Sequence, residues 1–173
     1  KDTTASYSKV IFLPFLYGSN THTEAPSCFL GLTATTTKLE MIRSVYEGIV
    51  YSHKQHLDKL EKSLGKRPQV IRISGGGTNS KQWCQIFSDI LNIPVETLQG
   101  SELGGLGGAI ASQQAITGDS LEDAVRKMVR IKDRYEPDQE EHKKYIKKYE
   151  VYQEILKSMD TTFHSLKKLN EEL

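Results

Sequence analysis

The sequence predicts an α/β domain with parallel strands over residues 1–118, followed by a helical extension over residues 119–173. The first observation behind this prediction is an alternation of short apolar runs with longer segments of helical periodicity, which is typical of strands joined by helical crossovers. The second is a pair of glycine clusters, at 75–77 and 100–108, that follow two of the predicted strands. Both clusters bring bare backbone near one end of the sheet, where ligands of open α/β folds bind.

Composition and charge narrow the possible functions. The chain has 173 residues, of which 37% are hydrophobic and 26% are charged, and its formal net charge is +1. No excess of charge exists to drive binding to nucleic acid or to a membrane surface, so we predict neither partner. The two cysteines, Cys28 and Cys84, are expected to be reduced in a cytoplasmic protein, with Cys84 as a small core residue on a helix.

The first part of the chain contains a predicted strand and a long helix. Residues 10–16 form an apolar run that predicts a short buried strand, and Pro14 places that strand at a sheet edge or a bulge. The loop that follows is too long for a plain connection, so it is either functional or packed against the domain. Thr37 and Glu40 form a capping box that begins a long helix, and Gly65 ends it.

The middle of the chain repeats this alternation. We predict strands over residues 69–74 and 93–98, and a helix between them that is capped by Asn79 or Ser80 and ends near Asn92.

The rest of the chain is predicted to be helical. A helix rich in small residues covers 101–116, and Ser120 caps a further helix over 121–133. The last segment, 138–173, is predicted to be one charged helix whose apolar residues recur at spacings of three and four, a seam that docks on the domain or pairs with another helix, as in a homodimer. This seam comprises Tyr145, Tyr149, Tyr152, Leu156, Met159, Phe163 and Leu166.

Three successive glycines, Gly75, Gly76 and Gly77, stand where a predicted strand passes into a helix. Glycine loses more conformational freedom on folding than any other residue, so this position needs bare backbone. A tight turn, a close helix–sheet contact or a ligand against the main chain would each supply the reason. The residues alone leave close packing and a bound ligand equally open.

Glycine-rich turns of this kind occur in two nucleotide-binding motifs, the P-loop and the dinucleotide-binding fingerprint. No glycine-rich loop ends in Gly-Lys-Ser or Gly-Lys-Thr, which excludes a P-loop. Gly75, Gly77 and Ser80 have the spacing of a dinucleotide-binding fingerprint, and Glu96 stands where a ribose-binding acid belongs. An NAD-binding domain of the Rossmann type is therefore an alternative.

The sequence predicts no catalytic constellation and no metal site in this chain. His53 and His56 lie one helical turn apart without a third ligand, so we predict that they are surface residues. Arg43 and Glu47 are four residues apart on the long helix, which predicts a structural ion pair.

Three stretches resemble the C-terminal domain of the FGGY family of carbohydrate kinases. FLPFLYGSN resembles a strand and loop of the family, with Ser19 and Asn20 where many members have Glu-Arg, as in the L-xylulose kinase branch. SCFLGLTATTTKLEMIRSVYEG fits the family signature, and GGGTNSKQWCQIFSDILNIPV fits its adenosine motif, G-G-G-x-x-S-x-x-W-x-Q. GLGGA then stands where L-G-A-A is usual, and the tyrosines of the C-terminal tail also look like the family's.

The resemblance implies an actin-like ATPase fold of the ribonuclease H type, in which ATP lies between two such domains and a sugar hydroxyl is phosphorylated. It places the adenosine half of the site at Gly75, Gly76 and Gly77, with Ser80 at the base edge. It also implies that Gly107 and Gly108 wall the slot for the base.

The resemblance further implies that parts of the kinase lie upstream of Lys1. These parts are the first strands of the domain, the catalytic aspartate, the phosphate loop and the N-terminal sugar-binding domain. We therefore expect an incomplete sheet, Mg²⁺ bound mainly by the missing part, and no catalytic activity from this chain alone. A non-enzymatic interaction module that recruits a second helix is the alternative from another class.

Overall fold

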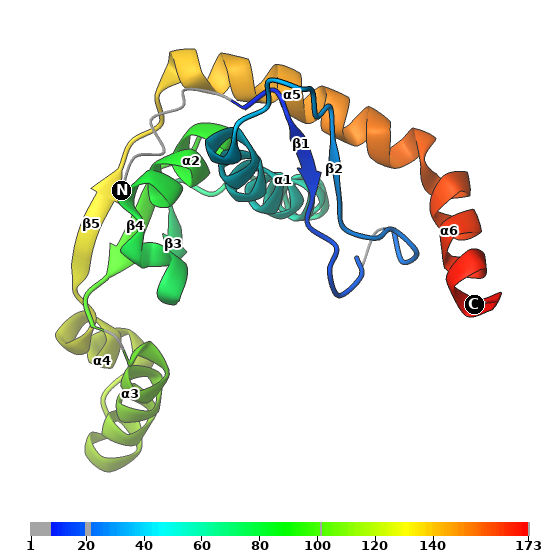
Figure 1. Ribbon diagram of the computed structural model, residues 1–173. Coiled ribbons are helices and arrows are strands. Elements are labelled where there is room, and N and C mark those ends of the chain that lie inside the picture. The colour runs from blue at the N-terminus through cyan, green and yellow to red at the C-terminus, as the bar shows by residue number, and fades with distance from the viewer. Residues whose placement is uncertain (1–7, 20–21, 101, 173) are drawn as a thin grey trace.

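The computed structural model describes residues 8–19, 22–100 and 102–172, and its elements are shown in Figure 1. In chain order they are β1 (Ile11–Leu13), β2 (Cys28–Leu30), α1 (Lys38–Leu64), β3 (Ile71–Ile73), the 3₁₀ turn η1 (Gly76–Asn79), α2 (Lys81–Leu91), β4 (Val95–Leu98), α3 (Leu103–Thr117), α4 (Leu121–Met128), β5 (Ile131–Tyr135), α5 (Gln139–Ser158) and α6 (Asp160–Glu172).

A three-stranded sheet in the order β3-β4-β5 carries the middle of the fold. β3 and β4 are parallel, as the alternation of strands and helices predicts, and their register places Ile71 opposite Val95. α2 joins them as the crossover and buries its apolar face, including Cys84, which is fully buried as predicted. Because β3 and β4 are parallel, their carboxyl ends meet at the same edge of the sheet.

The prediction of a helix over 121–133 is wrong for the second part of that segment, which contains the start of strand β5. That helix ends at Met128 as α4, and β5 then pairs antiparallel with β4. Arg134 and Glu96 form an ion pair across these strands at 2.8 Å, so a pairing with a distant strand outweighs the local helical pattern. The sheet therefore extends past residue 118, the segment 119–173 is not wholly helical, and the domain division at 118 stays a prediction.

A second, two-stranded sheet forms near the start of the chain. The predicted strand over 10–16 is shorter than expected, because β1 ends at Leu13, before Pro14. The long loop after it contains β2, a strand that the sequence did not predict. β2 pairs antiparallel with β1, and the rings of Phe12 and Phe29 lie 4.6 Å apart.

α1 packs against β1 and against α2. Its predicted boundaries are confirmed: the Thr37 side chain and Glu40 form the capping box, and Gly65 closes the helix with φ 65°. Gly48 faces β1 so closely that a Cβ atom at Gly48 would lie 2.2 Å from the carbonyl oxygen of Phe12. The absence of a side chain there allows the helix to lie directly against the strand.

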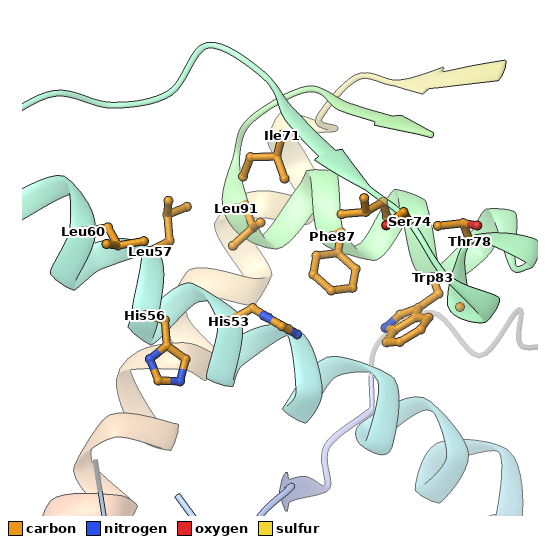
Figure 2. A pocket seen from close by; sticks show the side chains of 12 residues that line it. His53, His56, Leu57, Leu60, Ile71, Ser74, Thr78, Trp83, Phe87 and Leu91 are labelled. Carbon is orange, nitrogen blue, oxygen red and sulfur yellow. The ribbon is translucent and has the colours of Figure 1, made fainter. Parts of the chain in front are cut away.

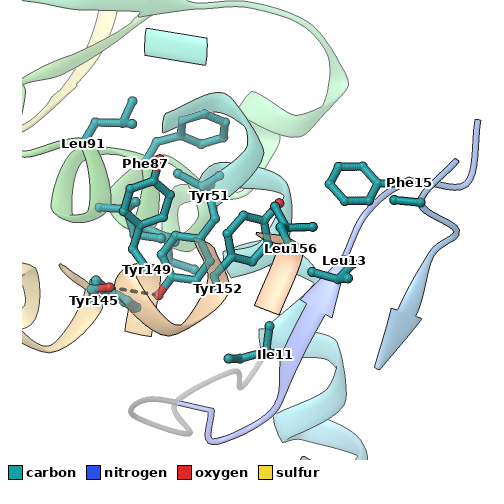
Figure 3. Close-up of a cluster of buried hydrophobic side chains, with 14 of the residues drawn as sticks. Ile11, Leu13, Phe15, Tyr51, Phe87, Leu91, Tyr145, Tyr149, Tyr152 and Leu156 are labelled. Carbon is teal, nitrogen blue, oxygen red and sulfur yellow. Dashed lines mark hydrogen bonds between the residues drawn. The ribbon is translucent and has the colours of Figure 1, made fainter. Parts of the chain in front are cut away.

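The C-terminal segment forms two helices where the sequence predicts one, because the helix breaks at Met159 between α5 and α6. The predicted seam docks on the domain itself. Tyr149 and Tyr152 pack around the ring of Tyr51 on α1, with centroid distances of 5.6 and 5.4 Å (Figure 3). Phe163 of α6 is buried in the same cluster.

A buried charge network ties α1 to α5. The Glu47 carboxylate is fully buried and accepts a hydrogen bond from Arg43 Nε at 2.9 Å, which confirms the predicted ion pair. Lys148 Nζ donates to the second oxygen of Glu47 at 2.5 Å and to the carbonyl oxygen of Ser8 at 2.5 Å. Burial lowers the pKa of Lys148, and the Glu47 carboxylate opposes that shift.

α3 and α4 pack on each other at one end of the molecule, away from α1 and α5 (Figure 1). Within the part of the chain that the structure describes, no helix has the length and apolar character needed to cross a membrane. Cys28 and Cys84 are both free thiols.

Candidate functional site

The three glycines lie between the carboxyl end of β3 and the start of α2. Gly75 has a backbone φ of 103°, a conformation that residues with a side chain rarely adopt, so this residue makes the turn. η1 follows, and Ser80 then caps α2 by accepting a hydrogen bond from Trp83 N at 3.2 Å. The Ser80 hydroxyl, predicted to face a base edge, therefore serves as a helix cap in this structure.

Gly77 is needed for packing. A Cβ atom on Gly77 would lie 1.8 Å from the indole ring of Trp83. That ring has little freedom to move, because Tyr46 stacks on it at 5.8 Å and Phe87 packs against it at 5.4 Å.

Gly76 has neither constraint. Its φ lies outside the left-handed region, and a Cβ atom there would meet nothing within 4 Å. The backbone of Gly76 needs no glycine for its conformation or for its contacts within the described part of the chain. Open space in front of it is the condition that a bound ligand requires.

That space is a hollow of about 580 Å³ at the carboxyl ends of β3 and β4, which we call the glycine hollow. Four elements line it: the turn after β3, the residues after β4, the start of α3 and the start of β5. The lining residues are Gly75, Gly76, Thr78, Asn79, Gln99, Gly100, Leu103, Ile131 and Lys132. Amide side chains, two aliphatic side chains and one ammonium group thus surround bare backbone.

The structure does not bring all predicted site residues together. Gly75 and Gly76 line the glycine hollow, whereas Gly77 packs on Trp83 and lines a different, apolar hollow with it. Gly107 and Gly108 are exposed on α3, are not among the residues that line the hollow, and face open space. Their role as walls of a slot stays a prediction.

Sequence reasoning missed the contribution of β5. Ile131 and Lys132 line the glycine hollow, but both fall in the segment predicted as a helix. IKDRY has three consecutive charged residues between Ile131 and Tyr135, so it lacks the alternation of apolar and polar residues that would have indicated a strand.

A second hollow, of about 410 Å³, lies between α1 on one side and β3 and α2 on the other (Figure 2). It is mainly apolar, with Leu57, Ile71 and Phe87 among its lining residues. His53 and His56 also line it, and the apolar surroundings lower the pKa of His53, which the neighbouring His56 lowers further. Both histidines are exposed, as predicted, and they border this apolar surface.

β3 is an open edge of the sheet. It pairs with β4 on one side, and no described residue pairs with its other side. An open edge is expected of an incomplete sheet, and the strands that the resemblance places upstream of Lys1 stay a prediction.

Glu96 does not act as a free ribose-binding acid. One carboxylate oxygen accepts a hydrogen bond from Arg72 at 3.0 Å and the other from Arg134 at 2.8 Å, and these hydrogen bonds lower the pKa of Glu96. The alternative of a Rossmann-type domain is therefore wrong, because Glu96, its predicted ribose-binding acid, is already bound to two arginines. Among the described residues, no group of three or more histidine, cysteine and acidic side chains is placed to hold a metal ion.

Comparison with known proteins identifies relatives that match most of the chain. Residues 2–116 match the family model of the FGGY family of carbohydrate kinases, C-terminal domain. The L-xylulose/3-keto-L-gulonate kinase of Escherichia coli is 33% identical over 158 residues, which are 90% of this chain and 31% of that protein. A probable L-xylulose kinase of Pasteurella multocida is 31% identical over 86% of this chain and 30% of its own length. The chain thus spans about a third of these relatives.

Solved structures agree with this result. A ligand-bound xylulose kinase from Lactobacillus acidophilus superposes with a TM-score of 0.84 at 26% identity, over 95% of this chain and 34% of that one. Plasmodium falciparum glycerol kinase with ADP gives a TM-score of 0.73 at 26% identity, over 85% of this chain and 30% of that one. The actin-like α/β fold class is therefore confirmed, and the chain belongs to the FGGY family of carbohydrate kinases, matching its C-terminal domain.

Proposed function

We propose that this chain is the adenosine-binding part of an ATP-dependent kinase that phosphorylates a hydroxyl group of a pentulose. The observation that carries the proposal is Gly76, whose backbone faces the open glycine hollow although neither conformation nor packing requires a glycine there. The names of the relatives, which are mainly xylulose and L-xylulose kinases, support the choice of sugar.

The glycine hollow fits the adenosine part of ATP. Its volume of about 580 Å³ lies within the range of small-molecule sites. Leu103 and Ile131 offer apolar surface to a flat base, while the amides of Asn79 and Gln99 offer hydrogen bonds. Gly75 and Gly76 allow the sugar and phosphate to approach the main chain.

The same hollow does not provide the chemistry of phosphoryl transfer. None of the residues that line it is a carboxylate, so it offers neither a base for the attacking hydroxyl nor a ligand set for Mg²⁺. We therefore propose that the catalytic base, most of the Mg²⁺ site and the sugar site belong to the part of the kinase that this chain does not cover. On its own, the chain is expected to bind nucleotide weakly and to phosphorylate nothing. A cytoplasmic location and a homodimer stay predictions.

The test is Gly76→Val in the full-length kinase. Its Cβ atom meets no described atom within 4 Å, so the side chain has room to enter the hollow, and the KM for ATP should rise at least about tenfold while the Tm changes little. The KM for the pentulose serves as the internal control and should change little. If the variant altered only the oligomeric state and left ATP kinetics intact, the chain would be an interaction module instead.

A further inference from the structure

We propose that Lys132 of β5 recognises the phosphate charge of the nucleotide in the glycine hollow. This inference rests on the proposed function and adds a residue that the glycine motif does not contain.

The position of Lys132 follows from the pairing of β5 with β4. Gln99 N donates to the carbonyl oxygen of Arg130 at 2.9 Å, which holds the start of β5 beside the end of β4. Leu98 is opposite Ile131 in the same register. The start of β5 is therefore fixed at the sheet edge where β3 ends in Gly75 and Gly76.

A break in this pairing sets Lys132 apart. Thr97 pairs with Asp133 and Leu98 pairs with Ile131, so β5 has one residue more than β4 between these pairs, and that residue is Lys132. Such a bulge leaves the extra residue outside the ladder and changes the direction of its side chain, and bulges are frequent beside functional sites. Lys132 is among the residues that line the glycine hollow.

The charge of Lys132 is available to a ligand. It is the one formally charged side chain among the residues that line the hollow, and no described residue forms an ion pair with it. The nearby arginines are engaged. Arg130, just before β5, donates to the carbonyl oxygens of Arg126 and Val129, and Arg134 of β5 pairs with two glutamates. A lysine that lines the same hollow as exposed glycine backbone is suited to bind an anionic phosphate oxygen.

The test compares adenosine, AMP and ADP as ligands of the full-length kinase, which also contains the part of the site that this chain does not cover. Dissociation constants are measured by isothermal titration calorimetry for the unmodified kinase, Lys132→Gln, Lys132→Arg and Lys66→Gln. Lys66 is an exposed lysine before the amino end of β3, whereas the hollow is at the carboxyl end, so its replacement is a control for net charge.

Lys132→Gln should weaken ADP about tenfold and AMP less, and leave adenosine unchanged, because only the phosphates interact with the ammonium group. Lys132→Arg should retain most of the affinity, and Lys66→Gln should bind like the unmodified kinase. A loss shared equally by adenosine and ADP, or no loss at all, would overturn the role of Lys132 while leaving nucleotide binding intact. If the unmodified kinase bound none of the three ligands, the proposed function would itself fail.

Discussion

Replacing Gly48 by alanine tests whether contact between the backbones of α1 and β1 holds the core together. The new Cβ atom would lie 2.2 Å from the carbonyl oxygen of Phe12, a distance that real Cβ atoms do not show. Restoring a separation of 3.0 Å requires α1 and β1 to move apart by about 0.8 Å. Both segments carry core residues, among them Leu13 and Val50, so the shift loosens the packing around them.

Two opposing effects decide the magnitude. Overpacking in a close-packed core costs about 1–3 kcal/mol, and the upper part of that range, about 2–3 kcal/mol, applies here because the Cβ atom meets a backbone oxygen that cannot swing aside. The helical preference of alanine over glycine stabilises by about 1 kcal/mol. The free energy of unfolding should therefore fall by about 1–2 kcal/mol. With a urea dependence of about 2 kcal/mol per molar, the midpoint of unfolding should fall by about 0.5–1 M.

Urea unfolding followed by circular dichroism measures this change. Gly104→Ala in α3 is the matched control, because its Cβ atom would meet nothing within 4 Å and only the helical preference acts. That variant should be at least as stable as the unmodified chain. A Gly48→Ala variant with an equal or higher urea midpoint would refute the close contact between α1 and β1.

Two further changes address the glycine turn and the tyrosine seam. Gly77→Ala should lower the Tm, because its Cβ atom would lie 1.8 Å from the Trp83 ring. The Trp83 ring must then move, which should change the tryptophan fluorescence spectrum. An unchanged Tm and spectrum would contradict this account. Tyr149→Phe should lower the free energy of unfolding by about 1 kcal/mol at neutral pH, because the Tyr149 hydroxyl donates to Asp58 at 2.9 Å. Tyr152→Phe should leave the free energy of unfolding unchanged or raise it, because the Tyr152 hydroxyl is buried without a partner among the described residues. Burial raises the pKa of both phenols above the unfolded value of about 10. Their contribution to stability is therefore complete below pH 10 and is lost as the pH rises further. Tyr152→Phe should reduce that loss of stability in unfolding curves measured at alkaline pH. A Tyr152→Phe variant that lost stability at neutral pH would contradict the assignment of an unpaired hydroxyl.

Features that depend on neighbours along the chain were predictable from the sequence. The capping box of Thr37 and Glu40 is complete within four residues, and so is the turn of helix that brings Arg43 to Glu47. The turn at Gly75 belongs to the same class, since its φ of 103° is a conformation that glycine adopts far more readily than other residues.

Features that depend on distant partners were not predictable. The segment that became β5 fits a helical pattern, and only the free edge of β4 makes it a strand. Lys148 completes the Glu47 pair from a position far along the chain, which no local spacing reveals. The glycine hollow needs both kinds of information, because Gly76 comes from a local motif and Lys132 from a non-local strand pairing.

The core joins residues that are far apart in the sequence, so it cannot be completed until the last of them has been synthesised. Ile11 and Leu13 of β1 pack in one cluster with Leu156 of α5 and Phe163 of α6. A ribosome that adds about 5–20 residues per second needs on the order of ten seconds to pass from β1 to α6. During that interval the apolar faces of β1 and α1 have no α5 to cover them. Chaperone binding at this stage would protect the apolar faces of β1 and α1 until α5 and α6 have been synthesised.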